Sequence, residues 1–233
     1  MDLIREEALI GKEAVEKLKH AHVAIFGIGG VGSFAAEAIA RSGIGEITIV
    51  DKDVVDKTNV NRQLIALYST FGKSKVEVMK ERIMDINPDA IVHTHAIFYN
   101  SESDFSFAGI DYVIDASDTV IYKIHIMKEC LKRKIPMISS MGAANKMDPT
   151  RFQIADISKT HTDPLAKVIR TKLRKEGIKK GVTVVFSDES PIVVRPDVVE
   201  TVGNPNAAIR KAQMPPSSNA FVPSVAGLIA ASW

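Results

Sequence analysis

Short apolar runs recur through the first 150 residues and alternate with segments of another pattern. Five runs have the length and composition of strands, at residues 23–26, 47–50, 91–98, 112–116 and 136–140. The first, second and fourth are almost wholly apolar and rich in Val and Ile, as expected of strands covered on both faces.

Helical patterns lie between most of these runs. Residues 31–42 are rich in Ala and stop at Gly43, which is a typical helix end. Apolar residues recur at spacings of three and four in residues 73–86 (Val76, Met79, Ile83, Ile86) and in residues 121–133 (Ile121, Ile124, Met127, Leu131). Strands that alternate with helices predict an α/β fold with a doubly wound, mostly parallel, Rossmann-like sheet.

The regular alternation stops after residue 150. We expect further strands at residues 152–157 and 182–187, a basic helix at about 164–176, a long loop at 195–220 where Pro and Ser gather, and a buried helix at 221–233. Residues 1–150 are therefore predicted to form a nucleotide-binding Rossmann-like region, and residues 151–233 a C-terminal extension of the same domain.

Composition narrows the functional class. The chain has 233 residues and is 45% hydrophobic, enough for a substantial core, and its 30 basic and 28 acidic residues nearly cancel. A single cysteine, Cys130, excludes an internal disulfide and a cysteine-built zinc site. The sequence also lacks a secretory signal and a long apolar run, so we expect a soluble, cytoplasmic protein with no membrane partner.

A glycine-rich loop follows the first predicted strand. Gly27, Gly29 and Gly32, with Gly30 between them, fit the G-x-G-x-x-G pattern at a strand-to-helix junction. Such loops let backbone N–H groups approach a phosphate at the helix N-terminus. Asp51 ends the second strand, where a carboxylate accepts hydrogen bonds from a ribose. These features suit an NAD enzyme and an ATP enzyme equally.

The residues after Asp51 favour a nucleoside triphosphate. An Arg and a Lys would neutralise a departing pyrophosphate, and a carboxylate after the fourth strand would hold magnesium. In chain order the polar candidates are Asp53, Asn59, Arg62, Gln63, Lys75 and Asp118. Asp115, at the end of the fourth strand, is expected to cap the turn.

The stretches GIGGVGS, DKD, NVNRQ, GKSK and DASD resemble the ubiquitin-activating-like superfamily of adenylating enzymes (the ThiF, MoeB and HesA group), which form acyl-adenylates on carboxylates. The resemblance implies that Asp51 binds the ribose, that Asn59, Arg62 and Lys75 bind the phosphates, and that Asp118 binds magnesium. It also implies that Arg5 reaches into the site of a partner subunit, so that the enzyme is an obligate homodimer.

Other segments are more specific. ARSGIG (40–45), INP (86–88), SSMGAANKMDPT (139–150), ADISKT (155–160), the stretch 163–179 and FVPSVAGLIAAS look like the tRNA threonylcarbamoyladenosine dehydratase family. The resemblance implies ATP-dependent activation of the threonyl carboxylate of the modified adenosine, then cyclisation with release of AMP. The substrate supplies its own nucleophile, so no thiol is needed, and Cys130 is interpreted as a core residue.

The basic stretch 164–180 suits an RNA partner. We expect Leu165, Val168, Ile169 and Leu173 to be buried, leaving Lys167, Arg170 and Arg174 as an exposed stripe, with Lys175 beside it, that contacts tRNA phosphates. A face used only for solubility is the alternative interpretation.

Three other functions stay open on the sequence alone: an adenylyltransferase for a sulfur-carrier or ubiquitin-like protein, an NAD(P) oxidoreductase, and a non-catalytic RNA-binding module. A monovalent cation near residues 141–149 and a sulfur-transfer protein partner are also left open. His93, His95, His125 and His161 show no metal-ligand spacing, so they are given no role.

Overall fold

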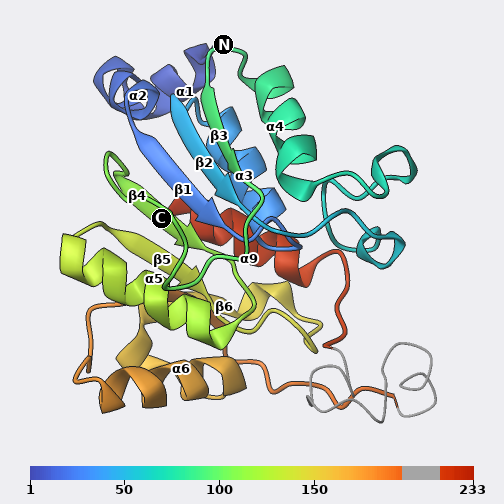
Figure 1. Ribbon diagram of the computed structural model, residues 1–233, viewed down its shortest axis with the longest axis vertical. Helices are drawn as coiled ribbons and strands as arrows, with labels where there is room; N and C mark the ends of the chain where they lie inside the picture. The colour runs from blue at the N-terminus through green and yellow to red at the C-terminus, as the bar shows by residue number, and fades with distance from the viewer. Residues whose placement is uncertain (196–215) are drawn as a thin grey trace.

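The computed structural model describes residues 1–195 and 216–233. Its centre is a seven-stranded sheet in the order β3-β2-β1-β4-β5-β7-β6 (Figure 1). The strands are β1 (His22–Phe26), β2 (Glu46–Val50), β3 (Ile91–His95), β4 (Tyr112–Asp115), β5 (Met137–Ser140), β6 (Phe152–Asp156) and β7 (Thr183–Ser187). Neighbouring strands pair in parallel except β6, which runs antiparallel to β7. The predicted doubly wound, mostly parallel sheet is confirmed.

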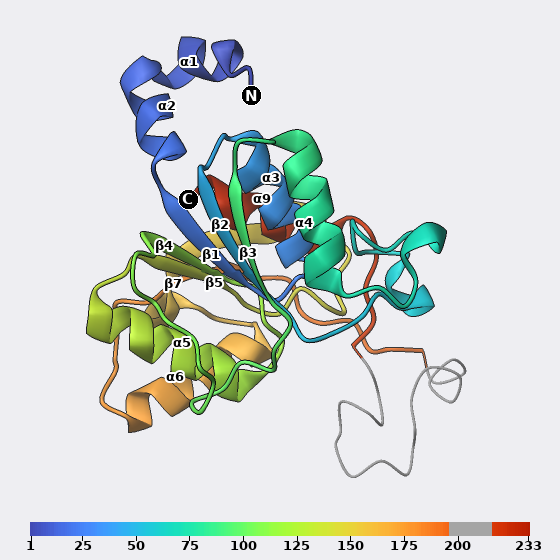
Figure 2. The ribbon, with the colours of Figure 1, turned by 45° about the horizontal axis from the view of Figure 1, so that its top comes forward.

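Helices cover both faces of the sheet (Figures 1 and 2). They are α1 (Ile4–Ile10), α2 (Lys12–Lys19), α3 (Gly32–Arg41), α4 (Lys75–Ile86), α5 (Val120–Arg133), α6 (Pro164–Lys175) and α9 (Val222–Ser232), with short 3-10 turns η1 (Lys57–Asn59), η2 (Tyr68–Thr70), η3 (Pro149–Arg151) and η4 (Ile157–Lys159). Helices α3, α4 and α9 share one apolar core with the sheet, and α5 and α6 share a second core on the other face.

Sequence patterning explains this layering. All five residues of β1 are buried, as its apolar run predicts for a central strand of a covered parallel sheet. In α4, Val76, Met79 and Ile83 are buried along one side. The spacing of the apolar residues thus determines which side of α4 packs against the sheet.

The C-terminal part of the chain completes the same sheet. Strands β6 and β7 extend it beyond β5, and α9 packs against α3. A Cβ added at Gly227 of α9 would lie 2.2 Å from the carbonyl oxygen of Val31, so only glycine permits this approach. The boundary proposed at residue 150 stays a prediction, and most of the loop predicted at 195–220 lies outside the described residues.

Several local predictions were wrong. The N-terminal helices α1 and α2 were not predicted, and α1 has no buried residue. Ile121, expected on the buried side of α5, is 70% exposed, and Val168 of α6 is 43% exposed, because each helix buries a narrower face than its apolar spacing suggests. In the described part of the chain, no helix has both the length and the apolar character to cross a membrane.

Candidate active site

A cavity of about 950 Å³ opens at the carboxyl ends of the central strands. From β1 the chain continues to β2 and β3 on one side of the sheet, and it then crosses to β4, β5 and β7 on the other side. The direction in which strands are added therefore reverses between β1 and β4. Open α/β sheets bind ligands at this reversal. The predicted residues that line the cavity are Gly27, Gly29, Gly30, Asp51, Asp53, Asn59, Arg62, Gln63, Lys75 and Asp118.

The glycine loop is shaped by close backbone contacts. Gly27 has a φ of +88°, and a Cβ there would lie 2.8 Å from the carbonyl oxygen of Ala116. At Gly32 a Cβ would lie 1.7 Å from the carbonyl oxygen of Gly27. Gly32 is not among the residues that line the cavity, and this close approach lets α3 start directly beneath the loop; its role in ATP binding stays a prediction.

Asp51 is held at the end of β2 by two backbone donors. Its Oδ2 accepts a hydrogen bond from the Ile28 N–H at 2.7 Å, and its Oδ1 accepts one from the Asp53 N–H at 2.8 Å. Burial raises the pKa of this carboxyl above its ordinary value, although the nearby Lys75 ammonium and the two N–H groups act in the opposite direction. The carboxylate therefore joins the glycine loop to the residues after β2.

Lys75 and Arg62 bring positive charge to this wall of the cavity. The Lys75 ammonium is nearly buried at the start of α4 and lies 3.1 Å from the carboxylate of Asp53. Nη1 of Arg62 donates to the carbonyl of Thr58 at 2.8 Å and to the side-chain oxygen of Asn61 at 3.0 Å. Burial lowers the pKa of the Arg62 guanidinium, which is the desolvation that an anionic ligand would relieve.

Asn59 and Gln63 are buried beside these cations. The Asn59 side chain accepts a hydrogen bond from the Asp56 N–H at 3.1 Å and so closes η1. Gln63 lies against the glycine loop, and its buried Oε1 has no hydrogen-bond partner among the residues that the structure describes. Such an atom is costly unless a bound group satisfies it, so the donor set of this wall fits a polar ligand.

The turn after β4 carries Asp118. Asp118 lines the cavity and accepts a hydrogen bond from the Thr119 hydroxyl at 3.1 Å. Beneath it, Asp115 caps the turn as expected, because its Oδ1 accepts from the N–H and the hydroxyl of Ser117 at 3.0 and 2.7 Å. Its other oxygen lies 3.1 Å from the Lys123 ammonium, a buried ion pair that the sequence did not predict.

Sequence reasoning missed one end of the cavity, the aromatic lobe, which aromatic side chains line. Phe98 and Tyr122 pack edge to face with ring centroids 4.5 Å apart, and the Lys52 ammonium lies 4.1 Å from the Phe98 ring centroid. All three side chains line the cavity. The sequence did contain a signal, because Phe98 is an aromatic residue close after the third strand. The predicted strand over residues 91–98 included Phe98, so the residue was not considered for the site.

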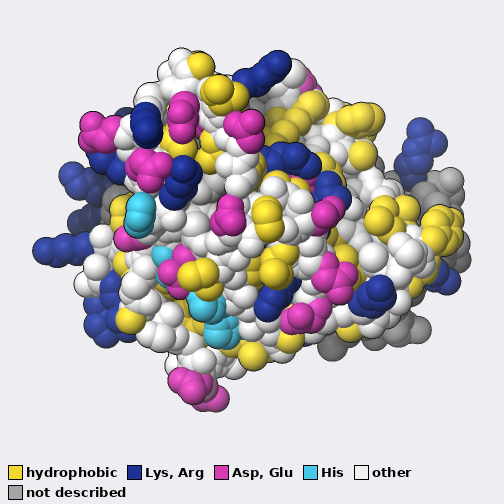
Figure 3. Space-filling model, turned by 90° about the horizontal axis from the view of Figure 1, so that it is seen from above, with side chains coloured by type: hydrophobic (Ala, Val, Ile, Leu, Met, Phe, Trp, Pro, Cys, Tyr) yellow, Lys and Arg dark blue, Asp and Glu magenta, His cyan; other side chains and the backbone are white. Residues whose placement is uncertain are grey.

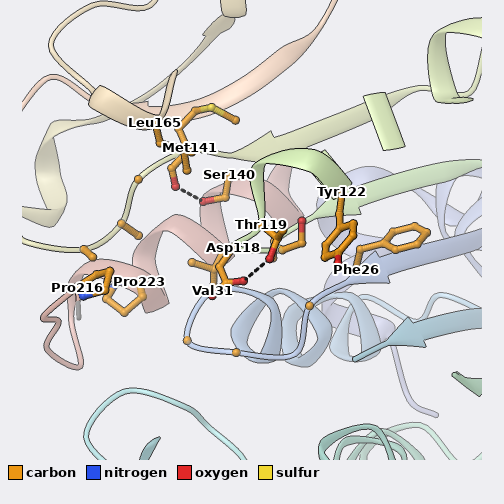
Figure 4. A pocket seen from close by; sticks show the side chains of 18 of the residues that line it. Phe26, Val31, Asp118, Thr119, Tyr122, Ser140, Met141, Leu165, Pro216 and Pro223 are labelled. Carbon is orange, nitrogen blue, oxygen red and sulfur yellow. Dashed lines mark hydrogen bonds between the residues drawn. The ribbon is translucent and has the colours of Figure 1, made fainter. Parts of the chain in front are cut away.

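A second lobe was also missed. Figure 4 shows Asp118 and Thr119 between Tyr122 on one side and Pro216 and Pro223 on the other. This second lobe is lined by Met141, Ala143, Ala144, Leu165, Pro191, Pro216 and Pro223, and by the polar residues Ser140, Asn145 and Ser218. Beside it, the Lys146 ammonium donates to the Gly142 carbonyl at 2.6 Å and pairs with Asp163 at 2.7 Å.

Other predicted residues lie away from the cavity. Arg5 is exposed on α1, next to the amino ends of the strands and remote from the cavity of its own chain (Figure 2). On α6, Lys167, Arg174 and Lys175 are exposed as expected. Arg170 is half-buried, because its Nη1 donates to the carbonyl of Thr160 at 2.9 Å, so it does not belong to the exposed stripe.

Histidines meet at the amino end of the sheet. His22, Glu46 and His93 place ligand-type atoms within 4.8 Å of one another, a grouping that strand pairing creates and that spacing could not predict. Each side chain already has a partner in the fold: His22 Nε2 lies 2.7 Å from the Thr48 hydroxyl, and His93 Nε2 lies 2.8 Å from Glu46 Oε1. Hydrogen bonding accounts for the group without a metal.

The fold and the cavity together define an α/β nucleotide-binding protein of the doubly wound class. Its cavity is lined by two basic residues, Arg62 and Lys75, and by the carboxylate of Asp118. The ThiF family model matches residues 3–232, and the chain belongs to this family.

Comparisons with individual proteins agree with the family. The chain is 71% identical over 227 residues to the tRNA threonylcarbamoyladenosine dehydratase of Bacillus subtilis, covering 97% of this chain and 89% of the relative. The crystal structure of E. coli TcdA, a tRNA threonylcarbamoyladenosine dehydratase, in complex with ATP superposes with a TM-score of 0.85 at 37% identity, covering 97% of this chain and 88% of that one. The E. coli molybdopterin-synthase adenylyltransferase is 34% identical over 134 residues, covering 57% of this chain and 53% of its own length.

Proposed function

We propose that this protein is an ATP-dependent dehydratase that adenylates the threonyl carboxylate of threonylcarbamoyladenosine in tRNA and allows the group to cyclise. The observation that carries the proposal is the cavity itself, which Arg62, Lys75 and Asp118 line together with the second lobe. The relatives with the same family fold and the printed name of this activity support it.

The chemistry needs two steps. The substrate carboxylate attacks the α-phosphorus of ATP, and the bond from this phosphorus to the β-phosphate oxygen breaks, releasing pyrophosphate. Negative charge grows on the leaving group, where Arg62 and Lys75 would stabilise it. An atom of the threonylcarbamoyl group then attacks the activated carbonyl and expels AMP, and the nucleoside loses the elements of one water.

The binding residues divide this work. Asp51 would accept hydrogen bonds from the ribose, while the glycine loop, Asn59 and Gln63 would hold the phosphates together with Arg62. Asp53 would orient the Lys75 ammonium, which lies 3.1 Å away. Magnesium, when bound, would supply charge neutralisation on the phosphate oxygens, and Asp118 is the carboxylate that would hold it.

A thiol intermediate has no place in this scheme. Cys130 is fully buried on α5, and burial raises the pKa of its thiol to about 12. A thiol that stays protonated in the core is not a nucleophile. Direct cyclisation is efficient without one because the reacting groups belong to one molecule.

The proposed assembly is a homodimer. Arg5 lies near the amino ends of the strands, so it could serve only the cavity of a partner subunit. Exposed apolar side chains support such an assembly: Ile4 and Leu9 on α1, and Leu67 and Tyr68 on the loop that projects beside α4. Hydrophobic side chains also gather at the right of the surface in Figure 3, where this loop projects.

The tRNA is proposed to lie along α6. Acidic and basic side chains intermingle on the face seen in Figure 3, so the molecule has no general attraction for polyanions there. Helix α6 differs because Lys167, Arg174 and Lys175 are exposed on it, and its first residues, Pro164 and Leu165, line the cavity. RNA phosphates on α6 would thus place a nucleotide near the second lobe.

One experiment tests the reaction directly. The protein is incubated with ATP, magnesium and tRNA bearing threonylcarbamoyladenosine, and the mass of the released nucleoside is then measured by mass spectrometry. We expect its mass to fall by that of one water molecule. Asp118→Ala and Arg62→Ala should abolish conversion while circular dichroism shows a retained fold. Wild-type turnover in either variant would show that the site is assigned wrongly.

The second candidate is an adenylyltransferase for a sulfur-carrier or ubiquitin-like protein, favoured only by the partial match to the molybdopterin enzyme. Pyrophosphate exchange stimulated by such a carrier, and not by modified tRNA, would establish it. The monovalent cation near residues 141–149, the sulfur-transfer partner and the cytoplasmic location stay predictions; in the described structure the Lys146 ammonium already contacts the Gly142 carbonyl in that turn.

A further inference from the structure

Asn145, in the turn after β5, joins three segments of the chain. Its N–H donates to the carbonyl of Ser217 at 2.7 Å, and its side-chain Oδ1 accepts from the Ser217 N–H at 2.8 Å. Its own carbonyl accepts from the Ile192 N–H at 2.7 Å. One residue therefore fixes the positions of two others that lie far away in the sequence.

The neighbours of these partners form one wall of the second lobe. Pro191 precedes Ile192, while Pro216 and Ser218 flank Ser217, and all three of these neighbours line the cavity. The Asn61 side chain donates to the Ser218 carbonyl at 2.9 Å and secures the same wall from the side of Arg62. Asn145 lines the cavity itself, and its hydrogen bonds set the position of this wall of the second lobe.

The backbone explains why asparagine stands here. Asn145 has a φ of +59°, a conformation that asparagine tolerates better than most residues with a side chain. Two neighbouring contacts hold the turn. The Lys146 ammonium donates to the Asp163 carboxylate, and the Glu189 carboxylate accepts from the N–H groups of Met147 and Asp148 at 2.9 and 3.0 Å. The strained residue is held on both sides by contacts that do not involve its side chain.

The second lobe suits a planar group that carries polar substituents, because Asn145 and Ser218 line it beside the apolar side chains. Met141, Leu165, Pro216 and Pro223 surround it, and Figure 4 shows Asp118 between these residues and the aromatic lobe. The aromatic lobe lies on the other side of Asp118, where the adenosine of ATP would bind under the proposed function, and the glycine loop reaches from there to the second lobe, where Gly30 lies against Pro223. The second lobe is thereby left for the acceptor.

We propose that Asn145 is a positioning residue for the acceptor: it holds the wall against which the modified adenosine lies and so sets where the threonyl carboxylate meets the α-phosphate. This inference rests on the proposed function. None of the hydrogen bonds of Asn145 goes to Arg62 or to the glycine loop, so we expect its replacement to affect the acceptor more than ATP.

The test separates the two substrates. Asn145→Gly keeps the positive φ and removes the side-chain hydrogen bond to Ser217. The KM for modified tRNA should rise about tenfold, the loss expected from one such bond. The KM for ATP, and ATP binding measured by calorimetry without tRNA, should change less than about twofold. Asn145→Ala should be impaired in the same direction and more severely, because alanine disfavours this φ.

Lys134→Gly is the matched control. Lys134 has the same φ of +59° at the end of α5, away from the cavity, so glycine relieves the same backbone strain there without touching the second lobe. Both KM values should stay at the wild-type level in this variant.

Each outcome of these measurements either supports or overturns the inference about Asn145. An unchanged KM for tRNA in Asn145→Gly, or equal rises in both KM values with a lower melting temperature, would overturn the inference, since the residue would then be merely structural. A wild-type protein that removes no water from the modified nucleoside would overturn the proposed function and this inference with it. An active wild type with an unaffected variant would overturn the inference alone.

Discussion

Asp115 and Lys123 form an ion pair with 3.1 Å between Oδ2 and Nζ, and neither side chain is more than 1% exposed. The Ser139 hydroxyl donates to the same Asp115 oxygen at 2.6 Å, so the pair ties β4, β5 and α5 together. Because the other Asp115 oxygen holds the Ser117 turn, this buried network supports the backbone that carries Asp118.

Removing one partner of this pair should be costly. Lys123→Met leaves an uncompensated buried carboxylate, which typically lowers the free energy of unfolding by about 3–5 kcal/mol. Urea denaturation followed by circular dichroism measures the loss. The double variant Lys123→Met with Asp115→Asn removes the buried charge and should recover part of the stability; a double variant less stable than Lys123→Met would refute this electrostatic explanation.

Asp51 should link nucleotide affinity to pH. Burial raises its pKa, so the carboxyl takes up a proton at higher pH than an ordinary Asp. Its contribution to the stability of the ligand-free protein is therefore present below the unfolded pKa and is lost as pH rises through the folded one. Ribose binding requires the carboxylate, so ATP affinity should change in the opposite direction and weaken as pH falls through the raised pKa of Asp51.

Asp51→Asn is the control for this pH effect. It should weaken ATP binding by about 1.5–3 kcal/mol, since hydrogen bonds to a charged acceptor are lost. The remaining pH dependence, measured by calorimetry, should be shallower than in the wild type because residue 51 no longer titrates. Identical slopes in the two proteins would exclude Asp51 as the source.

Arg5 should act across the dimer. Arg5→Ala and Asp118→Ala should each be inactive alone. Mixed and allowed to exchange subunits, they form heterodimers in which one cavity has an intact Asp118 and an Arg5 from the partner. Random exchange should restore about one quarter of the wild-type activity, because half of the dimers are mixed and each has one intact site. No recovery, despite exchange verified with tagged subunits, would contradict the assignment.

The exposed cations of α6 should control the salt dependence of tRNA binding. Replacing Lys167, Arg174 and Lys175 by Gln should reduce the slope of log affinity against log salt by roughly two to three, about one for each lost phosphate contact. ATP binding should not change. Lys17→Gln on α2 removes an equally exposed cation and should leave the slope unchanged; an unaltered slope in the α6 variant would favour a face used only for solubility.

Local pattern determined most of the architecture. Contiguous apolar runs predicted the central strands β1, β2 and β4, because a strand covered on both faces is apolar throughout, and the glycine loop marked the first strand-to-helix junction. The edge strands β3 and β6 contain exposed or half-buried polar residues, so their pattern was weaker. Helix faces were harder to predict. Ile121 and Val168 fit the helical spacing and yet are exposed, since spacing gives the direction of a side chain and not what lies opposite it.

The sequence by itself determined the doubly wound sheet and the candidates for phosphate, ribose and magnesium binding, because these depend on short motifs next to strand ends. Only the tertiary structure decided which residues share the cavity: it brought in Phe98 and Tyr122, placed Arg5 away from its own site, and joined Asn145 to Ile192 and Ser217. Contacts between segments distant in sequence arise from strand order and packing, and no local pattern encodes them.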